Sequence, residues 1–290
     1  MKNVFLFCSL LSASSLTFAA QVSSEDIENA PERVFTESTT LSSIEQIKNM
    51  AANSDCSRYS WKSRGRAPAG YTKGVALSFA RSLCRLKGVS PPSPLAKIES
   101  AADTRNDRKD ALTHYASTFA ARNMSISVAG ADTLRALYTL GLGLGMRESS
   151  GSYCEGWDTS AGSNRPSSAA EAGLFQTSYD SIGASSELSK LYSEYRANPQ
   201  RCMLDVFKQG ASCSSQKVLG TGAGATYQAF NKACPAFATE YAMTLLRILR
   251  THFGPINRKE AEINLSCNSM LKNVQSLVVS DLSNVCKDIL

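Results

Sequence analysis

The sequence predicts a mainly α fold, a helical bundle held by disulfide bonds, and three observations lead to this prediction. Apolar residues recur at helical spacing through most of the chain, whereas the strict alternation typical of strands is scarce. Nine cysteines occur in 290 residues. One long irregular segment, residues 149–172, follows an apolar helix and is rich in serine and glycine. We therefore expect helices with a small loop or β region beside that helix.

The first forty residues have the composition of a processed leader. Residues 1–20 contain one lysine, a short apolar run and the small-residue ending Phe18-Ala19-Ala20, which together predict a secretory signal peptide. The apolar run is too short to span a bilayer as a helix. Residues 21–40 are polar and acidic and predict a flexible leader. We expect a secreted or periplasmic protein without integral membrane association.

The cysteines and the net charge indicate which covalent bonds, metals and binding partners to expect. Removing Cys8 with the signal peptide leaves eight cysteines, an even number that predicts up to four disulfides whose pairing the spacing does not fix. Zinc is disfavoured because no Cys-x-x-Cys occurs and the chain has two histidines, so we expect no metal and no organic cofactor. The formal charge of +6 falls to about +5 without Lys2, which suits an anionic polymer and is too small to indicate nucleic acid.

The helices are expected in two parts of the chain. Ser42-x-x-Glu45 is a capping box that predicts a helix start, and residues 75–87 form a second helix closed by Gly88 and a proline-rich turn. We therefore expect residues 41–94 to be a helical N-terminal segment packed on the body. Residues 95–290 would be the main domain, ending in a helical extension. Its helices are predicted at 107–121, 132–142, 186–197, 200–208, 226–233 and 236–252, followed by a pair of helices near Cys267 to Cys286.

Between the first two helices, residues 57–74 combine basic and aromatic side chains without an acid. Tyr59, Trp61 and Tyr71 alternate with arginines and lysines in a stretch predicted to be irregular. Such a loop could bind an anionic polymer or stack on sugar rings. More often such a loop packs its aromatic rings on the body and leaves its charges in water, and this is the preferred interpretation.

Glu148 is the candidate catalytic residue. It closes the apolar helix that begins near Asp132, directly before the Ser/Gly-rich segment. Burial and the partial negative charge of a helix C-terminus both disfavour an ionised carboxyl there. A carboxyl that stays protonated near neutral pH can act as a general acid. A solvent-exposed glutamate at a helix end is the structural alternative.

Other classes of function fit less well. A serine hydrolase is disfavoured because Gly-x-Ser-x-Gly is absent, and His114 and His252 lie in helical contexts that suggest structural or solvent-facing roles. The glycines at 141, 143 and 145 are spaced as in dinucleotide motifs, but no strand precedes them. These glycines are better explained by close helix packing.

The order of motifs around Glu148 resembles the soluble lytic transglycosylases and goose-type lysozymes of the lysozyme-like superfamily. Glu148-Ser149 at a helix end is followed by Gly173-Leu-Phe-Gln176, then by Ala229-Phe-Asn231, and then by Tyr241 on the next helix. The resemblance covers residues 132–253 and implies an α+β lysozyme-like fold. A looser similarity points to an exported lysozyme of predatory bacteria that acts on deacetylated peptidoglycan.

The resemblance implies a role for each matching residue. Glu148 would be the catalytic acid and Ser149 would orient it. Gln176 would reach a bound sugar from the wall of the cleft formed by residues 173–176. Asn231 would hydrogen-bond the sugar beside the scissile bond, and Tyr241 would approach the Glu148 carboxyl. Two positions depart from the family pattern: Phe175 stands for methionine and Phe230 for tyrosine.

A second carboxylate would separate two mechanisms. A hydrolase usually has a second carboxylate beside the general acid. The candidates are Glu155, Asp158 and Glu171, with Asp158 ranked first. Asp158 or Glu171 could also pair with the free amine of a deacetylated glycan. A transglycosylase needs no such partner.

The expected function is a monomeric lysozyme or muramidase that cleaves peptidoglycan glycan strands, with a preference for deacetylated peptidoglycan as a hypothesis. The alternatives are a non-hydrolytic lytic transglycosylase and a cell-wall-binding protein of lysozyme-like shape without turnover.

Overall fold

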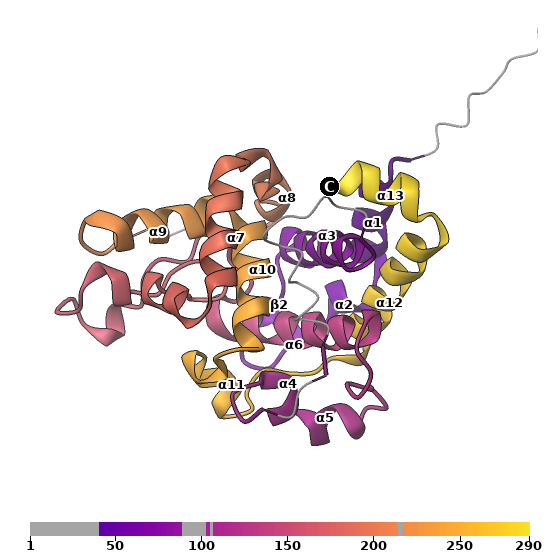
Figure 1. Ribbon diagram of the computed structural model, residues 1–290, viewed down its shortest axis with the longest axis horizontal. Coiled ribbons are helices and arrows are strands. Elements are labelled where there is room, and N and C mark those ends of the chain that lie inside the picture. The colour runs from indigo at the N-terminus through magenta and orange to yellow at the C-terminus, as the bar shows by residue number, and fades with distance from the viewer. Residues whose placement is uncertain (1–40, 89–102, 105–106, 214–216) are drawn as a thin grey trace, which may run out of the picture. The chain divides into compact units, whose positions relative to one another are not determined.

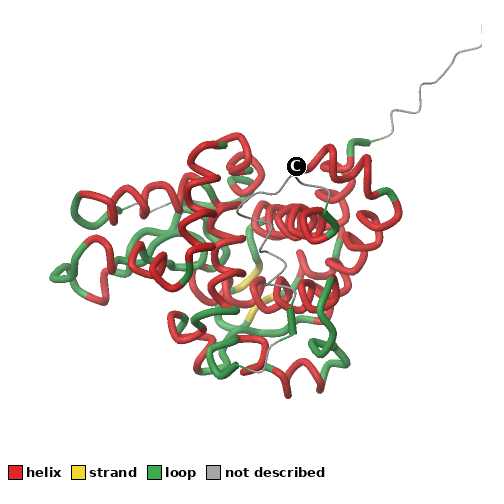
Figure 2. The backbone as a smooth tube through the Cα atoms, in the orientation of Figure 1, coloured by secondary structure: helices red, strands yellow, loops and turns green. Residues whose placement is uncertain are grey.

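The computed structural model describes residues 41–88, 103–104, 107–213 and 217–290, and the fold below refers to these (Figure 1). The predicted signal peptide, the flexible leader and the proline-rich turn with its boundary at residue 94 lie outside the described residues. Within them the chain is mainly helical, as predicted. Figure 2 shows one small strand pair among the helices. It is the antiparallel hairpin of β1 (Ser60–Trp61) and β2 (Gly65–Arg66).

The N-terminal segment packs into the body. α1 (Ser43–Asn53) begins at Ser42, whose hydroxyl accepts the Glu45 N–H as the capping box predicts. After the short α2 (Asp55–Arg58), the long α3 (Ala69–Leu86) contacts α1 and the C-terminal helices α12 (Leu265–Ser280) and α13 (Leu282–Ile289). In Figure 1, α1, α12 and α13 lie together on one side of α3.

The other helices lie around α6 (Ala131–Ser149), whose last turn carries Glu148. Below it in Figure 1 lie α4 (Ala111–His114), α5 (Ala116–Ala120) and α11 (Gly254–Asn257). To the left of α3 in the same view lie α7 (Ser186–Ala197), α8 (Leu204–Phe207), α9 (Gly222–Ala233) and α10 (Pro235–Leu246). The short 3₁₀ turns are η2 (Thr159–Ala161), η3 (Ser167–Ala169), η4 (Tyr179–Ala184), η5 (Pro199–Cys202) and η6 (Arg250–His252).

Several predicted boundaries were wrong. α3 begins at Ala69, six residues before the expected start, and the predicted helix 236–252 ends at Leu246 and is followed by η6. The predicted helix 107–121 begins later, at Ala111, because Asp110 caps that start by accepting the N–H groups of Leu112 and Thr113. It is also divided at Tyr115 into α4 and α5. The helix predicted at 200–208 is likewise the pair η5 and α8.

The glycines of α6 allow close packing, as the sequence suggested. A Cβ at Gly143 would collide with the backbone of Glu262, and one at Gly145 would collide with the Tyr71 hydroxyl. That hydroxyl donates to the carbonyl oxygen of Leu142 at 2.7 Å, so α3 and α6 are joined through the gap that the glycines leave. α6 is therefore fixed closely against its neighbours along its final turns.

The eight cysteines form four disulfides. Cys56–Cys267 and Cys84–Cys286 tie the N-terminal segment to α12 and α13 across more than 200 residues of sequence. The other two bonds, Cys154–Cys213 and Cys202–Cys234, hold the irregular region and the α7–α10 side. Disulfides persist in oxidising compartments, so this framework fits an extracellular protein. None of the described helices is both long and apolar enough to cross a bilayer.

The aromatic residues of the basic loop pack on the body. Trp61 is 3% exposed and Tyr71 is fully buried, while Tyr59 is partly buried and meets Trp61 edge to face. Trp61 and Tyr71 are therefore not available to stack on a ligand in this structure. For these two residues the preferred interpretation, that the rings pack on the body, is confirmed.

Candidate functional site

Glu148 lies one residue before the end of α6, where the chain turns sharply away. Ser150 adopts a left-handed conformation with φ 55°, and the N–H groups of Ser150 and Gly151 return to Met146 and Gly145. This cap ends the helix and leaves the Glu148 side chain partly exposed at its edge. The predicted position of Glu148 at a helix C-terminus is confirmed.

Ser149 connects the helix end to the Gly-Leu-Phe-Gln turn. Its buried hydroxyl lies 2.8 Å from the carbonyl oxygen of Leu174 and 3.0 Å from that of Gly145. The hydroxyl thus donates to main-chain oxygens and not to the Glu148 carboxyl. Ser149 holds the two segments together, so any effect of it on the orientation of Glu148 is indirect.

The Glu148 carboxyl has a strongly perturbed affinity for its proton. Burial raises its pKa from 4.5 to about 8, and the negative charge of Glu171 adds to the increase. The positive charges of Arg258, Arg64 and Arg147 act in the opposite direction. Burial was the first cause expected from the sequence, whereas the second carboxylate was not placed in advance.

Glu171 is the carboxylate that the fold brings toward Glu148. Burial raises its pKa from 4.5 to about 7, Arg165 opposes this increase, and Asp158 adds to it. Because Glu171 loses its proton first, its negative charge then favours the protonated form of Glu148. Near neutral pH the pair can thus hold one carboxylic acid and one carboxylate. Such a division between two neighbouring groups is typical of acid/base sites.

Asp158, ranked first as the second carboxylate, has a different environment. It is exposed and caps η2, where it accepts the Ser160 hydroxyl at 2.6 Å and the Ser160 N–H at 2.9 Å. The bond from the Ser160 side chain is the main cause that lowers the pKa of Asp158. Asp158 affects Glu171 by its charge, and Glu171 is the residue coupled to Glu148. The fold thus couples Glu171 to Glu148, whereas the catalytic role of either acid and a contact between Asp158 and substrate stay predictions.

The Gly173–Gln176 turn begins two residues after Glu171, and the side chain of its own glutamine stabilises it. Ala172 and Thr177 pair as an isolated antiparallel bridge around it. Gln176 is 8% exposed, with φ 46°, and its amide donates to the carbonyl oxygens of Gly173 at 2.9 Å and Gly156 at 3.3 Å. The Gln176 side chain closes the loop in this structure and does not extend toward a ligand as expected.

Asn231 supports the same turn from α9. It is fully buried, and its amide donates to the carbonyl oxygen of Ala172 at 2.7 Å and to the Thr177 hydroxyl at 2.9 Å. Gly173, whose φ is 79°, lies directly against the Asn231 amide. The expected direct bond from Asn231 to a sugar is not supported, because no part of the side chain is exposed.

Tyr241 is also buried, and its position corrects a second expectation. Its hydroxyl bonds the Ser181 hydroxyl at 2.7 Å, and burial raises its pKa to about 12. Its ring contacts those of Tyr227 and Phe237. Tyr241 thus belongs to an aromatic core beneath the site and is bonded to Ser181 in place of the Glu148 carboxyl. Phe230, which replaces the usual tyrosine, packs on Phe237 in the same cluster.

Two residues of the site were missed from the sequence. The first is His252 of η6, whose Nε2 atom lies 3.7 Å from a carboxylate oxygen of Glu171. Its side chain is 10% exposed, and Nε2 has no hydrogen-bond partner among the described residues. Burial lowers the His252 pKa, against the opposing effect of the Gln176 carbonyl. The chain has only two histidines, and this scarcity was the one signal available.

The second missed residue is Arg64, from the turn of the β1–β2 hairpin. Its guanidinium donates to the Arg147 carbonyl oxygen at 2.6 Å, and its positive charge lowers the pKa of both Glu148 and Glu155. Burial has the larger, opposite effect on Glu155, whose pKa is raised. The N-terminal segment therefore contributes a cation to the site of the main domain.

Nothing in the described part of the chain groups three or more metal-ligating side chains in a way that could hold a metal ion. Comparison with known proteins gives no match to a family model, to a curated protein or to a solved structure.

Proposed function

We propose that the protein is a glycosidase that cleaves the glycan strands of peptidoglycan, with Glu148 as the general acid. The observation that carries the proposal is a pair of coupled carboxyls: Glu148 at the end of α6, with a pKa of about 8, and Glu171, with a pKa of about 7. Glycosidases commonly need one carboxylic acid and one carboxylate at the same bond. The motif order around Glu148 supports the choice of peptidoglycan as substrate.

The proposed reaction begins at the glycosidic oxygen. Protonated Glu148 donates its proton to this oxygen as the bond to the sugar carbon breaks, so the leaving group departs as an alcohol. The carbon that remains has oxocarbenium character. Ionised Glu171 then either removes a proton from an attacking water or attacks the carbon itself, and water completes the hydrolysis in both cases.

Hydrolysis is favoured over transglycosylation because Glu171 is present beside Glu148. In a lytic transglycosylase the sugar's own hydroxyl attacks, and Glu148 would act as acid and then as base without a second carboxylate. A wall-binding protein without turnover is the other alternative. It would have no use for a carboxyl that stays protonated at neutral pH.

We further propose a preference for deacetylated glycan, which the acids near the site support. Glu155, Asp158 and Glu171 lie on the segment that follows α6, and an ammonium group on the sugar would gain from their negative charges. Equal rates on acetylated and deacetylated walls in a turbidity assay would contradict this preference.

Product analysis tests the proposal. Purified peptidoglycan, acetylated and deacetylated in parallel, would be digested with the wild-type protein and with Glu148→Gln, and the products identified by mass spectrometry. We expect reducing-end muramic products from the wild type and none from the variant. Anhydromuramic ends would identify a transglycosylase. No product from either wall, together with retained binding, would favour the non-catalytic alternative.

A further inference from the structure

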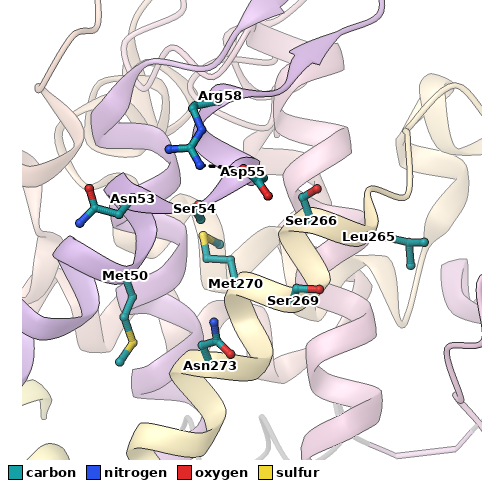
Figure 3. Close-up of a pocket in the computed structure, with 10 residues that line it drawn as sticks. All are labelled: Met50, Asn53, Ser54, Asp55, Arg58, Leu265, Ser266, Ser269, Met270 and Asn273. Atoms are coloured by element: carbon teal, nitrogen blue, oxygen red, sulfur yellow. Dashed lines mark hydrogen bonds and ion pairs between the residues drawn. The ribbon is translucent and has the colours of Figure 1, made fainter.

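Three pockets adjoin one another along one face of the described residues. The first, about 500 Å³, lies between the α1–α2 turn and the start of α12 (Figure 3). The second, about 430 Å³, is lined by Tyr59, Tyr115 and the segment 259–266, and shares Leu265 and Ser266 with the first. The third, about 320 Å³, shares Lys259 and Glu262 with the second. Adjacent pockets therefore share lining residues, and the three together are called the groove below.

The groove ends beside the candidate catalytic residue. Arg147, which precedes Glu148 on α6, lines the third pocket, and its guanidinium bonds a carboxylate oxygen of Glu260 at 3.2 Å. Arg64 bonds the Arg147 carbonyl oxygen at the same place. A long ligand held at Glu148 could therefore continue past Arg147 into the groove.

The lining of the groove selects the chemistry of that ligand. The lining of the groove contains more cationic than acidic side chains. The five cationic residues are Arg58, Lys62, Arg122, Arg147 and Lys259, and the three acidic residues are Asp55, Glu260 and Glu262. Hydroxyl and amide groups are frequent in the first pocket, where Figure 3 shows those of α12 opposite Asn53 and the Asp55–Arg58 ion pair. Leu265, 50% exposed at the junction of the first two pockets, adds an apolar contact. The groove thus suits a hydroxyl-rich chain that carries carboxylates and small apolar groups.

We propose that this groove binds the part of a peptidoglycan strand that extends beyond the cleaved bond, through its sugar hydroxyls and the carboxylates of its peptide stems. The proposal rests on the proposed function for the identity of the strand. The groove adds affinity for long polymer and leaves the chemistry at Glu148 unchanged. Its ionic part weakens as salt rises, because exposed charges are screened.

The test uses a variant that changes the groove without disturbing the fold. Lys62→Gln and Lys259→Asn remove two charges whose Nζ atoms bond no described residue, and asparagine tolerates the positive φ of 55° at position 259. The groove variant combines these two substitutions with Leu265→Ser, which removes the exposed apolar contact. A matched control, Lys190→Gln with Lys208→Gln, removes two charges from exposed lysines outside the groove.

Binding and turnover are measured separately. Co-sedimentation with purified cell-wall sacculi, in the full-length Glu148→Gln background, should show affinity about tenfold weaker for the groove variant and within twofold of the parent for the control. With Glu148 intact, the groove variant should cleave a short soluble peptidoglycan tetrasaccharide at the parental rate and intact walls more slowly.

Parental affinity and parental rates on intact walls for the groove variant would overturn the groove proposal while leaving the glycosidase proposal intact. A parent that neither cleaves walls nor sediments with them would overturn both.

Discussion

The ionised Glu171 carboxylate raises the pKa of Glu148. The two residues are 23 positions apart, one ending α6 and the other preceding the Gly173–Gln176 turn, and Ser149 ties these segments through its bond to the Leu174 carbonyl oxygen. The same contact that fixes the turn thus keeps the two carboxyls coupled. The protonation state of Glu148 therefore depends on the pair of carboxyls.

The first prediction concerns pH. The rate parameter kcat/KM on peptidoglycan should rise as Glu171 ionises near pH 7 and fall as Glu148 ionises near pH 8, giving a narrow bell. Glu148→Gln should lower kcat by at least about a hundredfold at every pH. A profile that stays flat from pH 5 to pH 9 would contradict the assignment of both roles.

The second prediction separates the two carboxyls. Glu171→Gln removes a negative charge, so the pKa of Glu148 should fall, because one cause of its increase is gone. ¹³C NMR titration of labelled glutamate carboxyls measures this shift without any need for activity. A hydrolase should also lose about 10²- to 10⁴-fold in kcat. A transglycosylase should keep its rate and show only the alkaline limb of its pH profile at lower pH.

The third prediction concerns His252. Burial keeps His252 neutral, and its unpartnered Nε2 lies 3.7 Å from a Glu171 carboxylate oxygen, where it can accept the hydrogen of the protonated carboxyl. His252→Gln removes this acceptor, so the pKa of Glu171 should fall and the acid limb of the pH profile should move to lower pH. The control is His114→Gln, whose Nε2 faces the Asn257 carbonyl oxygen. Identical profiles for the two variants would show that His252 has a structural role only.

The fourth prediction uses stability. A pKa raised on folding means that the folded state holds the Glu148 proton more tightly than the unfolded state does. This stabilisation is fully present below pH 4.5 and is lost as pH rises through about 8. Glutamine at 148 mimics the protonated form and lacks this loss. Relative to the wild type, Glu148→Gln should gain on the order of 5 kcal/mol in unfolding free energy between pH 4 and pH 9, since one pKa unit is worth about 1.4 kcal/mol and the pKa of Glu148 rises from 4.5 to about 8 on folding. Urea unfolding of both proteins at the two pH values measures the difference, and an unchanged difference would mean that Glu148 titrates normally.

The position of Glu148 could be predicted from the sequence because it depends on local rules. An apolar helix, a following Ser/Gly segment and the capping geometry are all encoded within about twenty residues. The start of α3 could not be predicted in the same way. Gly70 and Gly74 weaken its helical pattern, and their reason is tertiary: a Cβ at either position would collide with the backbone or ring of Phe207.

In the candidate site, too, the features set by local sequence could be predicted and those set by tertiary packing could not. Ser149, Gln176 and Asn231 do surround one turn, as the motif order implied. Motif spacing could not reveal that their polar atoms are used within the protein. It also could not choose Glu171 over Asp158, because that choice depends on how a loop folds back on the end of α6. His252 comes from still further along the chain and has no local motif.

The last prediction tests whether the packing of α6 fixes the site. Gly143 lies against the backbone of Glu262, which cannot yield as a flexible side chain would, so Gly143→Ala must displace α6 or the segment beside it. We expect a loss of about 1–3 kcal/mol in unfolding free energy, together with reduced activity, because Arg147 on α6 bonds Glu260 of that segment. The control is Gly183→Ala, where a Cβ would meet nothing within 4 Å and φ is not positive. Gly183→Ala should leave both stability and turnover near wild type in thermal unfolding and wall-digestion assays. Equal stability of the two variants would show that the segment at Glu262 can move, and that the glycines of α6 are not required to hold Glu148 in place.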